Sequence, residues 1–77
     1  MLNKGDKIVL EDMNKQLTAY SGVLENMIEF YQSLYDDMSE AKQEGDLGEA
    51  LTDLIDAIED VRGNVDSASV DIQVICR

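Results

Sequence analysis

The sequence predicts an all-α fold, an antiparallel two-helix hairpin whose helices meet along a coiled-coil seam. Apolar residues recur at alternating spacings of three and four in two long runs, which is the pattern of a heptad seam. A glycine-containing break separates the runs, and the sequence has no proline that would interrupt a helix. These observations predict one helical domain over residues 8–77. Residues 1–7, with Asn3, Gly5 and three charges, are expected to form a flexible N-terminal arm.

The first helix is expected over about residues 8–43. Its apolar positions alternate in spacing without a gap and form one stripe along the helix. The expected seam residues are Leu10, Met13, Leu17, Tyr20, Leu24, Met27, Tyr31, Leu34, Met38 and Ala41. At about 1.5 Å per residue, the apolar series from Leu10 to Ala41 spans roughly 48 Å.

The turn is expected at residues 44–46. Gly45 can adopt the left-handed conformation that ends a helix, and Asp46 followed by Glu49 has the spacing of a capping box. Leu47 is then the first residue of the second helix. The residues to which we assign the turn are Gly45, Asp46, Leu47 and Gly48.

The second helix is expected over about residues 47–75, a span of roughly 43 Å, so the two helices are long enough to lie along each other. Its apolar series again alternates between spacings of four and three. The expected seam residues are Leu47, Leu51, Leu54, Ile58, Val61, Val65, Ala68, Ile72 and Ile75.

A second apolar stripe flanks the seam of the first helix. It comprises Val23, Ile28, Phe30 and Tyr35, and it widens the apolar face beyond what one facing helix would cover. A chain of 77 residues also buries only about 60% of its unfolded surface. We therefore expect these residues to bind a protein partner and to complete a four-helix bundle, as a homodimer or with a different helical chain.

Composition excludes several classes of function. The sequence has no His and a single Cys, so zinc fingers, haem sites, Cys–His nucleophiles and Ser-His-Asp triads are excluded. We expect no catalytic residues, no metal and no cofactor, and therefore a protein that is not an enzyme. Cys76 cannot form a disulfide within the chain, which leaves a free thiol or an intermolecular bridge.

The charge is strongly acidic, with 17 Asp and Glu against 6 Lys and Arg, a net charge of −11. This balance opposes direct binding to nucleic acid. On the second helix four carboxylates follow helical spacing and form an acidic face: Glu49, Asp53, Asp56 and Asp60. The face either keeps the protein soluble or meets a basic partner, and an acidic inhibitor that mimics nucleic acid and blocks a basic groove is the alternative function.

No apolar stretch reaches the roughly 18 residues of a membrane span, and the N-terminal apolar run is shorter than the core of a signal peptide. We therefore expect no membrane insertion and a cytoplasmic protein. If it is secreted, it leaves the cell without a cleaved signal peptide.

The chain resembles the WXG family, the early-secreted-antigen-like helical hairpins of type VII secretion. The resemblance covers about residues 8–75 and rests on the length of the first helix, the turn segment 45–50 and the segment 61–71. The resemblance is to a degenerate member without the family's tryptophan: either Gly48 stands for the glycine of the Trp-x-Gly motif with Asp46 in the place of the tryptophan, or the motif is absent. The resemblance implies a secretion-associated partner, chaperone or substrate that pairs with another helical protein. Type III secretion needle subunits are similar in size, and a polymerising subunit is a further alternative.

Overall fold

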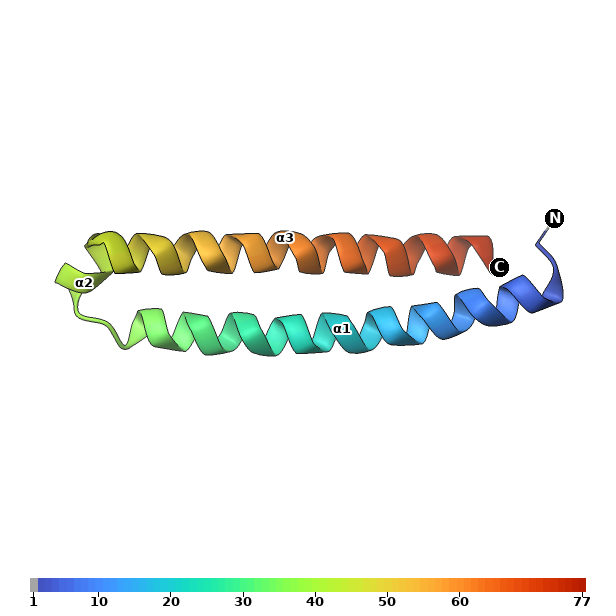
Figure 1. Cartoon of the computed structure of the whole chain (residues 1–77), viewed down its shortest axis with the longest axis horizontal. Coiled ribbons are helices and arrows are strands. Elements are labelled where there is room, and N and C mark those ends of the chain that lie inside the picture. Colours follow the sequence, from blue (N-terminus) through green and yellow to red (C-terminus); the bar gives the residue numbers. More distant parts are fainter. Residues whose placement is uncertain (1) are drawn as a thin grey trace.

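The protein is an elongated two-helix rod with a short helix at its turn (Figure 1). A computed structural model describes residues 2–77 as α1 (Lys4–Asp36), α2 (Glu40–Glu44) and α3 (Asp46–Ile75). The rod measures 57 × 15 × 13 Å. The two long helices lie side by side and antiparallel, with both chain ends at the end opposite α2 (Figure 1). The predicted all-α class is thus confirmed for the described residues.

The first helix begins earlier than expected, because Asn3 caps it. The Asn3 side-chain oxygen accepts a hydrogen bond from the Asp6 backbone N–H at 2.7 Å, and its amide donates to the Asp6 carboxylate at 3.0 Å. This cap satisfies an otherwise unpaired N–H of the first turn. The expected arm of residues 1–7 is therefore wrong for residues 4–7, which are helical; Met1 lies outside the described residues.

The chain turns through α2 rather than through one tight glycine turn. α1 ends at Asp36, so the expectation of a first helix reaching residue 43 is wrong. Ser39 starts α2 as its N-cap and accepts a hydrogen bond from the Lys42 N–H at 3.4 Å. A second N-cap inside the predicted helix gives the backbone a local alternative to continuing α1.

The start of α3 also differs from the capping box expected there. Gly45 has φ −86° and ψ −175°, which is extended rather than left-handed backbone, and it is the N-cap of α3 without a side-chain hydrogen bond. Asp46 is already helical, one residue before the predicted start at Leu47. The Asp46 side chain consequently makes no cap, and the Gly45 carbonyl accepts the first helical bond, from the Glu49 N–H at 3.1 Å.

Gly48 lets α2 pack directly on the first turn of α3. A Cβ on Gly48 would lie 2.1 Å from the Gln43 carbonyl oxygen and 2.6 Å from the Gln43 Cα, so only glycine fits. From the other side, the Gln43 side-chain amide donates to the Tyr35 carbonyl oxygen at 2.8 Å, near the end of α1. Gln43 thus joins the end of α1 to the start of α3.

About half of the predicted seam positions are correct. At most of the others, the residue that faces the opposite helix is the next one along the chain. Residues with restricted solvent access still alternate by three and four, but in a shifted series. From α1 and the residues after it they are Leu10, Asn14, Leu17, Ser21, Leu24, Ile28, Tyr31, Tyr35 and Met38. From α3 they are Gly48, Leu51, Ile55, Ile58, Arg62, Val65, Ser69 and Ile72, followed by Cys76.

Several predicted seam residues therefore do not face the other helix. Those exposed to solvent are Met13, Tyr20, Met27, Leu34, Ala41, Leu47, Leu54, Val61 and Ile75. The physical reason is that polar residues in the shifted series pair across the hairpin. Ser69 donates to the Asn14 side-chain oxygen, and Ser21 donates to the Asp66 carboxylate at 2.6 Å. Arg62 adds an ion pair across the hairpin to Glu25 at 4.0 Å and one within α3 to Asp66 at 3.9 Å.

Candidate interaction surface

The apolar residues displaced from the seam form a second, solvent-exposed series on each helix. On both helices it runs one position before the seam series. We call its apolar members the apolar face: Val9, Met13, Tyr20, Val23, Met27, Phe30 and Leu34 of α1, with Leu47, Ala50, Leu54, Ala57, Val61, Ala68 and Ile75 of α3. All of them except the half-buried Ala68 are exposed. Of the fifteen large hydrophobic side chains that are exposed within residues 2–77, eleven belong to this face.

The two halves of the apolar face lie on the same side of the hairpin. A step of one residue rotates the side-chain direction by about 100° around an α-helix. The step is toward the N-terminus on both helices, but the helices are antiparallel, so the two rotations are opposite when seen from one end of the rod. Both halves therefore turn to the same side, nearly perpendicular to the plane of the hairpin.

The face is unbroken in the half of the rod next to the turn. Every position of the exposed series is apolar between Tyr20 and Leu34 on α1 and between Leu47 and Val61 on α3. Polar residues enter the series only toward the chain ends, at Gln16, Asn64 and Asp71. At the centre of the α1 part, the Phe30 ring packs edge-on to Tyr31 with centroids 5.3 Å apart.

The opposite side of the hairpin is polar and acidic. It is formed by the series one position after the seam, and its exposed carboxylates come from both helices. They are Glu11, Glu25, Glu29, Asp36, Glu49, Asp56, Glu59 and Asp66. We call this the acidic side. Two members of the predicted acidic face, Asp53 and Asp60, lie two positions after the seam and point away from α1, and all four predicted residues are exposed.

The predicted partner residues divide between two locations. Val23 and Phe30 lie on the apolar face, with 56% and 61% of their surface exposed. Ile28 and Tyr35 lie in the seam and are half-buried against α3. Sequence reasoning missed most of the remaining members, among them Met13, Tyr20 and Leu54, because it placed them in the seam. The signal that could have found them is the presence of two complete heptad series, offset by one residue, on each helix.

Charge is distributed unevenly along the rod. Residues 21–64, the half containing the turn, hold twelve carboxylates and two cations. The half with the chain ends holds five carboxylates and four cations: Lys4, Lys7, Lys15 and Arg77. Almost all of the net charge of −11 therefore belongs to the turn half.

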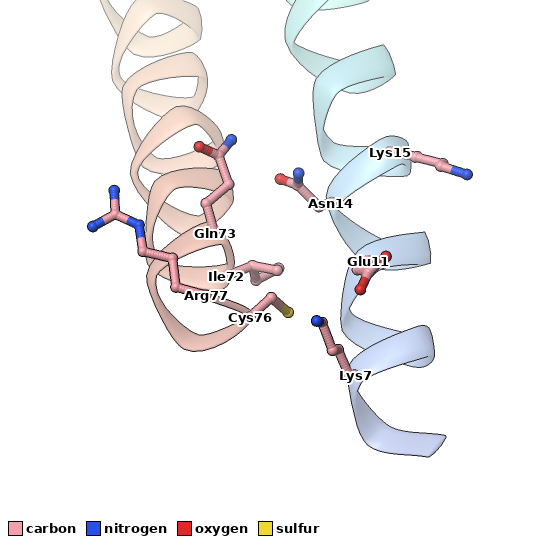
Figure 2. A pocket seen from close by; sticks show the side chains of 8 residues that line it. All are labelled: Lys7, Glu11, Asn14, Lys15, Ile72, Gln73, Cys76 and Arg77. Atoms are coloured by element: carbon pink, nitrogen blue, oxygen red, sulfur yellow. The ribbon is translucent and has the colours of Figure 1, made fainter. Parts of the chain in front are cut away.

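A pocket of about 380 Å³ opens between α1 and α3 at the end with the chain termini (Figure 2). Ile72 forms part of its wall, and Lys7 and Cys76 point toward each other across it (Figure 2). Lys15 and Arg77 also line the pocket, but their charged groups point away from the gap (Figure 2). The pocket is open and brings an ammonium group near a thiol, without a buried polar group that would select a ligand.

Within residues 2–77, no group of three or more Cys, Asp or Glu side chains is arranged to hold a metal ion. None of the helices described is both long and apolar enough to cross a membrane.

Comparison with protein-family models, curated proteins and solved structures gives no match to this chain. The function must therefore be argued from the surfaces of the hairpin.

Proposed function

We propose that the chain is a small acidic protein–protein interaction module that uses its apolar face to complete a helical bundle with another helical chain. One observation carries the proposal: one side of the hairpin is apolar, without interruption in the half next to the turn, while the other side is acidic. Soluble monomers rarely expose contiguous apolar patches larger than a few hundred Å². An exposed heptad series on each helix is suited to a facing pair of helices, since both helices of the hairpin then gain a second packing neighbour.

The resemblance to WXG hairpins supports a more specific form of the proposal, in which the chain is a type VII secretion-associated partner, chaperone or substrate. The elongated hairpin, with α2 at one end, is compatible with this form. It implies that the bound chain is also helical and carries an apolar face of similar length.

A negative charge introduced at either of two matched valines tests the interaction surface. Val23 on the apolar face and Val70 on the acidic side are 56% and 55% exposed. Val23→Asp and Val70→Asp therefore add the same charge at equally exposed helical sites. We expect Val23→Asp alone to abolish association in light scattering and to reduce binding of the neutral dye Nile red. Equal effects of the two substitutions would refute the apolar face as the interaction surface.

Phe30→Ala measures the contribution of one anchor. The side chain is 61% exposed, and burial of an aromatic anchor in an interface is worth about 2 kcal/mol, roughly thirtyfold in affinity. Helicity should change little, because Phe30 lies outside the seam. Unchanged association in sedimentation equilibrium would remove Phe30 from the proposed interface.

The acidic side favours a second candidate function, an acidic inhibitor that mimics nucleic acid and blocks a basic groove. The observation behind it is the concentration of twelve carboxylates in the turn half. This function predicts binding that weakens steeply with salt and depends on Asp53, Asp56 and Asp60 rather than on Val23.

A further inference from the structure

We propose that the partner covering the apolar face is a second copy of this chain, packed with both turns at the same end. This inference rests on the proposed function and names the partner of that surface. In the resulting four-helix bundle, α1 of each copy lies against α3 of the other. The two-fold axis then runs along the rod.

The exposed area fits a self-association of this kind. The chain exposes 5702 Å², whereas a folded monomer of its mass exposes about 4,700 Å². The excess of about 1,000 Å² is of the same order as the roughly 800 Å² that each partner buries in a standard stable interface. A second copy supplies an apolar face of the same length and pattern.

The pattern on the face determines how the two copies are oriented. A two-fold axis along the rod keeps every residue at its own height, so α1 meets the part of α3 that lies level with it. The bonds from Ser21 to Asp66 and from Ser69 to Asn14 fix those levels. At the same heights, Met27 is level with Ala57, and Phe30 lies between the levels of Leu54 and Ala57.

Large side chains of α1 thus meet small side chains of the other α3, which is the alternation that lets facing layers interdigitate. Leu34 is level with Ala50 in the same way. Toward the chain ends, Gln16 and Asp71 come to nearly the same level, while Asn64 is level with the region of Tyr20 and Val23.

The opposite arrangement, with the turns at opposite ends, mismatches the face. It places α1 against the second α1 and α3 against the second α3. The Asp71 carboxylate then lies near Ala50 and Gln16 lies near Leu34, so polar groups are buried without polar partners. Apolar positions next to the turn lose their apolar neighbours at the same time.

Charge favours that opposite arrangement, because two acidic turn halves would repel each other when they lie side by side. The carboxylates responsible are on the acidic side and the outer surface, away from the apolar face. At physiological salt the screening length is about 8 Å, shorter than the distance across two stacked helices, so this repulsion is largely screened. The pattern of the face therefore decides the orientation.

Cys76 provides the test, because it is the single thiol and lies beside the end of α3. A spin label on Cys76 reports the distance between the two α3 ends in a pulsed electron paramagnetic resonance experiment on the full chain at physiological salt. With turns at the same end, the labels lie on diagonal helices and should be about 15–25 Å apart. With turns at opposite ends, the separation is about 45 Å.

Light scattering on the labelled chain accompanies the distance measurement. A dimer with the short distance supports the proposal, provided that Val23→Asp removes the dipolar signal and Val70→Asp retains it. A dimer with the long distance overturns the orientation. If the chain is monomeric, the second copy is not the partner. The proposed function is refuted by a different result, namely equal effects of the two valine substitutions on Nile red binding.

Discussion

Gly48 is the position where the structure makes the sharpest prediction about stability. The Cβ of Gly48→Ala would sit 2.1 Å from the Gln43 carbonyl oxygen and 2.5 Å from the Gln43 carbonyl carbon. Both are backbone atoms, so no side-chain rotation relieves the overlap. α2 must move away from α3, and overpacking of this kind costs about 1–3 kcal/mol. Movement of Gln43 also disrupts its hydrogen bond to Tyr35, which is worth about 1 kcal/mol. The higher helix propensity of alanine relative to glycine stabilises the helix by about the same amount, so these two effects cancel.

The expected net destabilisation is therefore about 1–3 kcal/mol. For a domain of this size each kcal/mol lowers the Tm by about 4–8 °C. Thermal unfolding followed by far-ultraviolet circular dichroism, at one fixed protein concentration, measures the shift. Gly63→Ala is the matched control, because a Cβ there meets nothing within 4 Å. It should raise stability by up to about 1 kcal/mol. A Gly48→Ala protein as stable as the Gly63→Ala protein would refute the close packing of α2 on α3.

Two further substitutions test the ends and the centre of the hairpin. Asn3→Ala removes the hydrogen bond to the Asp6 N–H and should weaken the first turn of α1 by about 1 kcal/mol, seen as faster amide exchange at residues 5–8 and unchanged exchange at mid-helix. Arg62→Leu should raise the free energy of unfolding by about 1 kcal/mol in urea denaturation. The reason is that the Arg62 Nε is buried without a hydrogen bond in the described chain. The ion pairs of Arg62, at 3.9–4.0 Å, join half-exposed groups, so their loss costs little. A lower stability of Arg62→Leu would show that the ion pairs contribute more than this.

Much of the fold is predictable from sequence, because heptad periodicity and the absence of proline both specify long helices. Periodicity does not determine which of two neighbouring stripes packs against the other helix of the same chain. Both stripes of α1 share the three-four spacing, and the one containing Met13, Tyr20 and Met27 is the more apolar. In the structure, the stripe that packs against α3 is instead the one containing Asn14 and Ser21, whose side chains hydrogen-bond to α3.

The corner at α2 explains why composition is a poor guide to this choice. Gly48 belongs to the buried stripe of α3, and its contact with Gln43 sets the rotation of α3 relative to the turn. Such a backbone contact between residues five apart has no periodic signature in the sequence. The capping box at Asp46 was wrong because α3 begins one residue earlier, with Gly45 as its N-cap and Asp46 already helical.

The candidate surface was predictable only in part. Val23 and Phe30 were identified as exposed apolar residues flanking the seam, whereas Ile28 and Tyr35 belong to the seam itself. The α3 half of the apolar face depends on the same choice of stripe, so Leu54 and Val61 become surface residues only when the register is known.

The seam of this hairpin is graded from one end to the other. Next to the turn it contains the buried residues Gly48, Ile55 and Ile58. Among the described residues of the other half, which holds the chain ends, Ile72 alone is buried. Polar side chains occupy much of the remaining seam there, and an open pocket lies between the two helices beside Cys76. The helices should consequently unzip from the chain ends, with local opening that leaves the turn half folded. Refolding should proceed in the other direction, because zipping from the corner closes the shortest loops first.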